Sequence, residues 1–175
     1  MSAIYPHLDR KVIERWLARP FSAESFALVF GSRAAMIAAT IGLSFSVQIA
    51  ISTIIFALTG QTMLPHHPLD QYSAAMQFFG GSILSPLLET LFIQATGVFI
   101  FRRLLRANWT FTCVAVGCIF GALHGYGGSA LLKLSLTGIL LTAVFVIEKR
   151  KEGKPTLMTF ATHSIYNTIL WVARH

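Results

Sequence analysis

The sequence predicts an all-α fold, a polytopic bundle of about five transmembrane helices preceded by an interfacial helix. Hydrophobic residues make up 54% of the 175 residues and charged residues only 12%, a balance outside the usual range of soluble globular domains. Residues 34–58 contain no charged side chain, and about 20 apolar residues suffice to span a bilayer. Four further apolar stretches follow, at 77–101, 109–125, 128–147 and 156–172.

The chain length fits one domain, so we expect residues 34–175 to form a single helical membrane domain. Its first apolar stretch is long and begins after residue 33, which favours a retained span over a cleaved signal peptide. Residues 1–33 are expected to form a cytoplasmic or interfacial segment. Within it, residues 9–19 place apolar residues at helical spacing among basic ones, a pattern typical of a helix on a membrane surface. A solvated basic tail is the alternative interpretation.

The basic residues predict the orientation of the bundle. Twelve of the 14 Lys and Arg residues precede the first apolar stretch or follow the second and the fourth: Arg10, Lys11, Arg15, Arg19, Arg33, Arg102, Arg103, Arg106, Lys149, Arg150, Lys151 and Lys154. With five spans these clusters share one side, which the positive-inside rule makes cytoplasmic. We expect the amino terminus inside and the carboxyl terminus outside a bacterial cell membrane. The net charge of +7 then reflects topology, and no nucleic-acid partner is expected.

The connections between the stretches also predict structure. Residues 59–73 are rich in turn formers and contain His66 and His67, and adjacent histidines in such a segment favour a loop over a metal site. Residues 125–129, with the sequence GYGGS, are short and glycine-rich, so the third and fourth spans should form a tight antiparallel hairpin.

Small residues follow one face of the third stretch. Gly117, Gly121 and Gly125 recur every four residues, a spacing that lets a neighbouring helix approach closely. Cys113 and Cys118 lie in the same stretch at a spacing suited neither to a metal pair nor to a local disulfide. We interpret both cysteines as helix-packing residues.

Few residues inside the predicted spans can carry acid, base or ligand chemistry. They are Glu89 in the second span, His124 at the outer end of the third, and His163 with Asn167 in the fifth. His163 and Asn167 are one turn apart and should face one cavity. Each residue alone is more often a packing residue, but a carboxylate with two histidines on three spans indicates a functional site in the outer half of the bilayer.

This set of side chains suits water activation. A glutamate beside a histidine can hold and deprotonate a water, and a second histidine with an amide can stabilise the oxyanion formed at a peptide carbonyl. The sequence therefore suggests a peptidase without a covalent intermediate or a cofactor. Two histidines, a carboxylate and a water also form a plausible zinc site, but no HExxH motif is present, so a metal site is the weaker interpretation.

The same residues carry a family resemblance. The order Glu89, then Phe120 to His124, then His163 to Asn167 resembles the CPBP family of intramembrane proteases, which includes the CAAX prenyl endopeptidases and bacteriocin-processing relatives. In that family the motifs EExxxR, FxxxH and HxxxN lie on successive transmembrane helices. The resemblance covers about residues 80–172 and includes Pro86 just before Glu89. It implies water activation by Glu89 and His124, and oxyanion stabilisation by His163 and Asn167.

The first motif departs from the family pattern. The sequence ETLFIQ keeps Glu89 but has Thr90 and Gln94 in place of the second glutamate and the arginine. These two charges would form an ion pair four residues apart, and replacing a whole pair is tolerated better than leaving one charge unpaired. We expect Thr90 and Gln94 to hydrogen-bond to one another, so that a changed supporting shell surrounds an intact site.

The sequence thus predicts an intramembrane glutamic peptidase in the lipid bilayer, acting on a membrane-anchored or exported peptide or a membrane protein. Prenylated CAAX tails are less expected, because the predicted topology turns the site away from the cytoplasm. Two alternatives stay open. One is a non-catalytic scaffold or immunity-type binding protein, and the other is a small proton-coupled transporter that uses Glu89 and the histidines as a relay.

Overall fold

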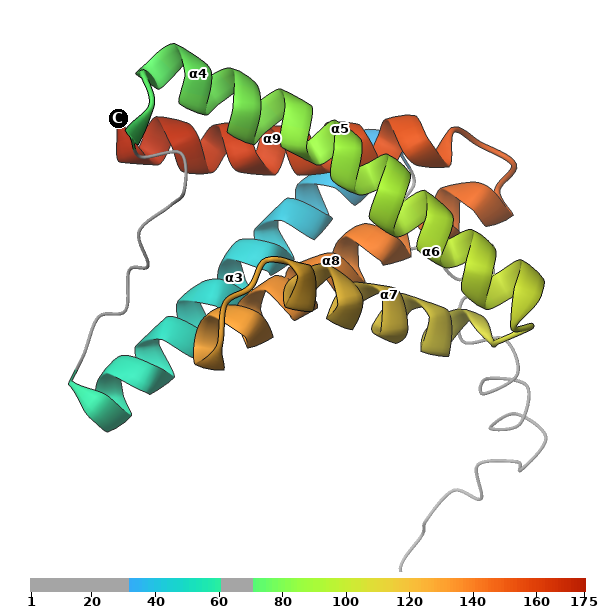
Figure 1. Ribbon diagram of the computed structural model, residues 1–175, viewed down its shortest axis with the longest axis horizontal. Helices are drawn as coiled ribbons and strands as arrows, with labels where there is room; N and C mark the ends of the chain where they lie inside the picture. Colours follow the sequence, from blue (N-terminus) through green and yellow to red (C-terminus); the bar gives the residue numbers. More distant parts are fainter. Residues whose placement is uncertain (1–31, 61–70) are drawn as a thin grey trace, which may run out of the picture.

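The computed structural model describes residues 32–60 and 71–175, and within these ranges the chain is helical and contains no strand. The described chain forms α3 (Arg33–Thr59), a long helix from Ala74 to Leu104, α7 (Trp109–Leu123), α8 (Gly128–Arg150) and α9 (Pro155–Arg174), arranged as in Figure 1. The five predicted helices are confirmed to within a few residues at each end. The expected interfacial helix at 9–19 and the loop with His66 and His67 lie outside the described residues, as does all but the end of the 1–33 segment.

The second helix is continuous but changes its winding along its length. Three α-helical pieces, α4 (Ala74–Phe78), α5 (Ser85–Glu89) and α6 (Thr96–Phe99), alternate with the π-helical pieces η2 (Phe79–Leu84), η3 (Thr90–Ala95) and η4 (Ile100–Leu104). We call the whole helix α4–η4. A π-helical turn bonds each N–H to the carbonyl five residues earlier, which widens the helix, and such turns occur frequently at functional sites.

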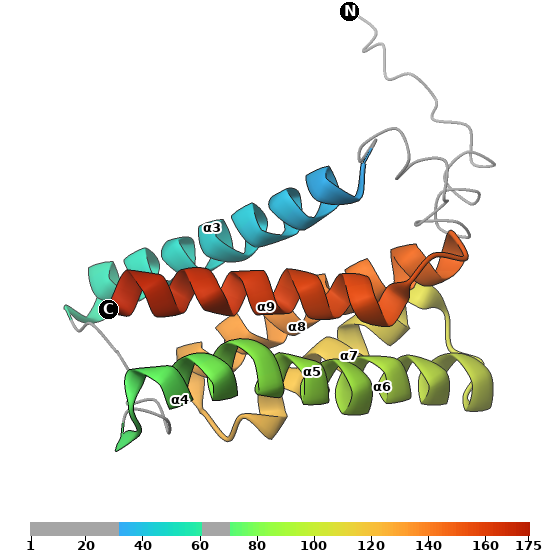
Figure 2. The same ribbon diagram turned by 90° about the horizontal axis from the view of Figure 1, so that it is seen from above.

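Helix α8 lies at the centre of the bundle and supplies residues to both hydrophobic clusters. One cluster joins α8 to α3 and α9 and contains Met36, Val144, Ile147 and Met158. The other joins α8 to α4–η4 and α7 and contains Val98, Cys113, Phe145 and Val146. Figure 2 shows α9 running antiparallel to α4–η4, with α3 along its other side.

Helices α7 and α8 form the predicted antiparallel hairpin, and glycines allow their close approach. A Cβ added at Gly117 would lie 2.7 Å from Cα of Ile139, and one at Gly121 would lie 2.7 Å from the backbone nitrogen of Ser135. From the opposite helix, a Cβ at Gly138 would lie 2.8 Å from Cβ of Phe120. The glycine seam is therefore confirmed for the first two of its three predicted positions.

Gly125 does not belong to this seam. It follows the end of α7, has a φ of +72° and would have no neighbour within 4 Å of an added Cβ. Its left-handed backbone conformation, which glycine adopts without steric cost, instead helps to turn the chain into α8. The packing role expected for the cysteines holds for Cys113, which is buried, and is wrong for Cys118, which is exposed; both are free thiols.

The basic ends of the helices gather at one end of the bundle. The guanidinium of Arg102 lies 3.9 Å from the ring centre of Trp109, and that of Arg150 lies 5.9 Å from the same ring. Arg33 pairs with the buried carboxylate of Glu148 at 3.2 Å. These contacts bring Arg33, Arg102 and Arg150 to one end of the described bundle, although they are far apart in the sequence.

Three described helices are long and apolar enough to cross a membrane: Arg33–Thr59, Ala74–Leu104 and Gly128–Arg150. Helix α7 is apolar but has only 15 residues, about 22 Å, and a bilayer hydrocarbon core measures about 30 Å. The chain is an integral membrane protein, and α7 stops short of the full thickness of the bilayer.

Candidate functional site

Glu89 lies midway along α4–η4, at the last residue of α5. Its side chain is only 18% exposed, and the hydroxyl of Ser85, one turn earlier, donates a hydrogen bond to its Oε1. The second carboxylate oxygen, Oε2, is buried and has no hydrogen-bond partner among the described residues. The carboxylate therefore has one oriented oxygen and one with unused acceptor capacity.

His124 caps the carboxyl end of α7 and faces this carboxylate. Its Nε2 lies 4.0 Å from Glu89 Oε1, and 26% of its side chain is exposed. Its Nδ1 lies 2.8 Å from the carbonyl oxygen of Phe120. Because a carbonyl oxygen can only accept, Nδ1 carries the proton, and in the neutral ring Nε2 presents a lone pair towards Glu89.

His163 approaches the carboxylate from α9. Its Nε2 lies 3.7 Å from Glu89 Oε2, and its side chain is 4% exposed. The buried ring of Phe120 contacts both histidines, with ring centres 4.7 Å from His124 and 5.7 Å from His163. Phe120 therefore contacts both imidazoles, and it packs so closely against α8 that a Cβ added at Gly138 would lie 2.8 Å from its Cβ.

Asn167 shares the face of His163, as predicted, but its amide already binds backbone. Its Nδ2 donates to the carbonyl of Gly81 at 2.8 Å, and the Ser164 hydroxyl donates to the carbonyl of Ser82 at 2.5 Å. Pro86 explains why these carbonyls are free, because it lacks the N–H that the fourth and fifth residues before it would bind. The second N–H of the Asn167 amide is not used by this contact.

Thr90 and Gln94 differ from expectation. Both are completely buried, but they do not hydrogen-bond to one another, and their side-chain polar atoms have no partner among the described residues. The four-residue spacing places the two side chains on one helix face without bringing a donor and an acceptor into hydrogen-bonding geometry. The expected pairing is wrong.

The structure brings together Glu89, His124 and His163 around Phe120, and places Asn167 one turn further along the same face of α9. Sequence reasoning missed Ser85 and Ser164. The signal for Ser85 was its position one turn before the only carboxylate of its span, on the same helix face. Ser164 had no comparable signal, because its partner is a carbonyl that becomes free only through Pro86.

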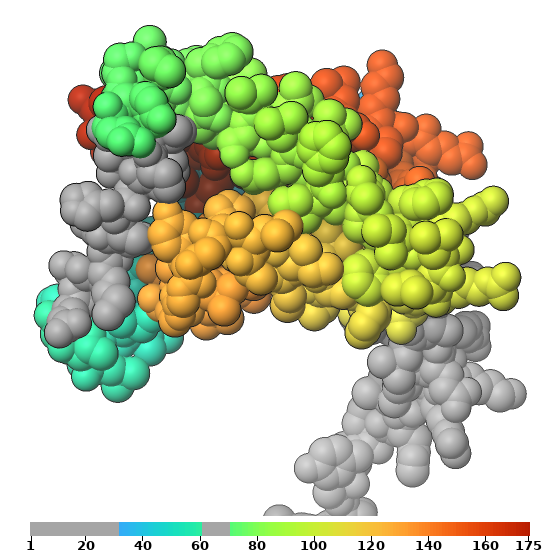
Figure 3. Space-filling view, in the orientation of Figure 1, coloured from blue at the N-terminus to red at the C-terminus, as the bar shows by residue number. Residues whose placement is uncertain are grey.

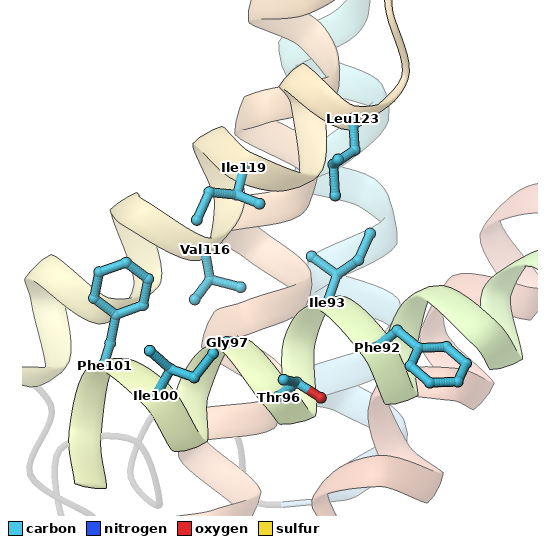
Figure 4. A pocket seen from close by; sticks show the side chains of 9 residues that line it. All are labelled: Phe92, Ile93, Thr96, Gly97, Ile100, Phe101, Val116, Ile119 and Leu123. Atoms are coloured by element: carbon cyan, nitrogen blue, oxygen red, sulfur yellow. The ribbon is translucent and has the colours of Figure 1, made fainter. Parts of the chain in front are cut away.

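No group of three His, Cys, Asp or Glu residues in the described ranges is arranged to hold a metal ion. A separate cavity of about 280 Å³ lies between α4–η4 and α7 and is lined mainly by Phe92, Ile93, Ile100, Phe101, Val116 and Ile119 (Figure 4). Its lining contains no ionisable side chain, so it suits hydrocarbon rather than chemistry. In the space-filling view of Figure 3 the surface is hollowed between α4 and the start of α8, with α9 at the bottom of the hollow.

Comparison with known proteins gives one match. Residues 71–169 match the family described as type II CAAX prenyl endopeptidase Rce1-like, a range that includes Glu89, Phe120, His124, His163 and Asn167. No curated protein and no solved structure matches the chain. The family match covers more than half of the sequence and agrees with the CPBP resemblance of its motifs. The chain therefore belongs to the type II CAAX prenyl endopeptidase Rce1-like family of membrane endopeptidases.

Proposed function

We propose that the protein hydrolyses a peptide bond within the membrane by a glutamic mechanism, with Glu89 as general base. One observation carries the proposal: the Glu89 carboxylate lies between the Nε2 atoms of two histidines, at 4.0 Å from His124 and 3.7 Å from His163. Both distances exceed a direct hydrogen bond, but one water oxygen can lie about 2.8 Å from both His124 Nε2 and Glu89 Oε1.

In this arrangement the attacking water donates one hydrogen bond to Glu89 and the other to the lone pair of His124. Its own lone pairs then remain free for the carbonyl carbon of the substrate. Glu89 takes a proton as the oxygen–carbon bond forms, and the carbonyl oxygen becomes an oxyanion. As the carbon–nitrogen bond breaks, Glu89 returns the proton to the leaving amine.

His163 and Asn167 are proposed to stabilise the oxyanion. The N–H on Nε2 of His163 and the second amide N–H of Asn167 would donate to it from one face of α9. Phe120 is proposed to keep the two imidazoles apart, so that each performs one role. Thr90 and Gln94 are proposed as supporting residues.

The substrate is proposed to be a membrane-anchored or exported peptide, or a membrane protein. Glu89 and His124 are partly exposed, so a chain outside the bundle can reach them. Because α7 is shorter than the hydrocarbon core and begins among the basic residues, His124 at its other end lies below the opposite membrane surface. This recess supports cleavage of a segment that enters the bilayer.

Replacing Asn167 by Ala is expected to lower kcat by about 10²–10³ with little change in KM, because one oxyanion donor is lost. The measurement is peptide cleavage in proteoliposomes. Ser164→Ala is the matched control, since Ser164 also donates from α9 to a carbonyl freed by Pro86. Both variants should lose a similar stability, about 1 kcal/mol, while only Asn167→Ala loses turnover. Equal losses of turnover would make Asn167 a structural residue.

Orientation is tested separately. Because Arg33, Arg102 and Arg150 gather at one end of the described bundle, a reporter fused after His175 should be active only outside the cytoplasm. A reporter inserted beside Arg103 should be active only inside. The reverse pattern would place the site on the cytoplasmic side. Prenylated cytoplasmic proteins would then be the favoured substrates.

A further inference from the structure

Several buried polar atoms without partners among the described residues lie on η3 and α9, two segments that contact one another. Thr90 and Gln94 on η3 and Thr159 on α9 are each 0% exposed. The hydroxyls of both threonines, both polar atoms of the Gln94 amide, and Nδ1 of His163 have no hydrogen-bond partner among the described residues. Buried polar groups are normally satisfied, so five such atoms on two contacting segments require an explanation.

Other buried threonines in this bundle hydrogen-bond to a carbonyl of their own helix, unlike Thr90 and Thr159. The hydroxyl of Thr142 donates to the carbonyl of Gly138 at 2.7 Å, and that of Thr162 donates to the carbonyl of Met158 at 2.8 Å. This bond to the preceding turn is the usual solution for a threonine in a helix. Thr90 and Thr159 do not make it, which leaves their hydroxyls available to a partner between the helices.

The unpartnered atoms belong to facing segments. Helix α9 contacts η3 and runs antiparallel to α4–η4, as Figures 1 and 2 show. Thr159 precedes His163 by one turn on α9, while Thr90 and Gln94 follow Glu89 on the other helix. Thr159 on α9 and the pair Thr90 and Gln94 on η3 therefore lie on the same side of the Glu89–His163 contact. This side is the one towards the basic end of the bundle.

The chemistry of these groups excludes most ligands. Thr90, Gln94 and Thr159 carry no charge, and no part of their side chains is exposed, so neither an ion nor a peptide is suited to them. Hydroxyls and an amide supply both donors and acceptors at short range. Water makes about three such bonds in protein interiors and is small enough to be enclosed.

We propose that Thr90, Gln94 and Thr159 enclose internal water that donates a hydrogen bond to Nδ1 of His163. A hydrogen bond accepted by Nδ1 places the ring proton on Nε2, the nitrogen that faces Glu89. The three residues are thus positioning residues that set the tautomer of His163. This inference rests on the proposed function for its purpose, because the oxyanion requires a proton on Nε2.

The first test uses the unaltered protein in lipid bilayers, with ¹⁵N-labelled histidine and glutamine. Solid-state NMR should show transfer of magnetisation from water to the Gln94 side-chain amide. It should also show His163 protonated on Nε2 and unprotonated on Nδ1, with the resonances assigned through His163→Gln and Gln94→Leu. A dry Gln94 amide, or a proton on Nδ1, would overturn the proposal.

Isosteric variants provide the second test. Thr90→Val and Thr159→Val should move part of the His163 population to the Nδ1–H tautomer and lower kcat by about tenfold, with KM nearly unchanged. Thr142→Val is the matched control, because its hydroxyl bonds within its own helix, and it should leave the tautomer unchanged. An unchanged tautomer in both test variants would overturn the proposal.

A stability measurement distinguishes a hydrated pocket from a dry one. If Gln94 binds water, Gln94→Leu should lower the melting temperature by about 2–4 °C, whereas removal of an unpaired amide from a dry pocket should raise it.

Failure of the proposed function can be distinguished from failure of this inference. In that case Glu89→Gln would still cleave substrate, while water transfer to Gln94 and the tautomer of His163 would be as described. If these two NMR results fail and Glu89→Gln is inactive, the function stands and this inference falls.

Discussion

Glu89→Gln is expected to abolish peptide hydrolysis and to leave the protein folded. The amide keeps the shape of the carboxylate, and its oxygen can still accept the hydrogen bond from Ser85, but it cannot take a proton from water. General-base catalysis contributes about 10²–10⁴ to a rate, so kcat should fall by at least that factor. The melting temperature in detergent should be unchanged or slightly raised, because an expensive buried carboxylate is removed. Cleavage and thermal unfolding are measured on the same preparation.

Glu148→Gln is the matched control, because Glu148 is a fully buried glutamate of the described helices that lies away from the candidate site. Its carboxylate pairs with Arg33 and accepts from the backbone N–H of Lys154 at 3.3 Å, so it links α3, α8 and the start of α9. This variant should lose stability and retain turnover once folded, the opposite of Glu89→Gln.

Each of three results would contradict the glutamic mechanism and favour another explanation. Persistent cleavage by Glu89→Gln would show that another group activates water. A failure of this variant to fold would make Glu89 a structural residue and favour a scaffold. A flux that depends on a pH gradient and is lost in Glu89→Gln, without cleavage in either protein, would favour a proton-coupled transporter.

Gly117→Ala is expected to separate the α7–α8 hairpin and to cost about 3 kcal/mol of stability, at the upper end for overpacking. The added Cβ would overlap the backbone of Ile139, with only 2.7 Å to its Cα, and a backbone cannot rotate away as a side chain can. Because α7 carries His124 and Phe120, turnover should fall together with stability. Unfolding in detergent and cleavage in proteoliposomes measure the two effects.

Gly42→Ala controls for the loss of glycine in an apolar helix. Gly42 lies in α3 and has nothing within 4 Å of an added Cβ, so its replacement should be neutral or slightly stabilising. If Gly117→Ala is as stable as Gly42→Ala, the two helices can move apart at little cost and the glycine seam is not essential.

Hydropathy and residue spacing along the sequence were sufficient to predict most of the helices. An uncharged stretch of about 20 residues is forced into a helix by the bilayer, because its backbone groups must bond within the segment, so the five helices followed from hydropathy. The shared face of His163 and Asn167 followed from their four-residue spacing, and the hairpin followed from its short glycine-rich connection. The misplacement of Gly125 in the seam arose because periodicity alone does not show where a helix ends.

Contacts between helices were only partly within reach of such reasoning. The convergence of Glu89, His124 and His163 was predicted from their motifs, but the bond from Ser164 to the carbonyl of Ser82 was not, because it joins residues far apart in the sequence. The predicted Thr90–Gln94 bond failed for a related reason. Spacing places two side chains on one helix face, but their rotamers and the neighbouring helix decide whether a donor meets an acceptor.

The sequence by itself determined that this is a helical membrane protein, that it carries the ordered Glu, His and His-Asn motifs of its family, and that most of its basic residues cluster at the ends of its apolar stretches. These features depend on composition and on spacing along one helix. The tertiary structure alone decided the distances at which Glu89 faces the two histidines, that Asn167 also binds the helix turn freed by Pro86, and that Thr90 and Gln94 are buried without partners among the described residues. Those outcomes depend on how each helix is rotated and shifted against its neighbours, and that is set by close packing around α8, which no single segment encodes.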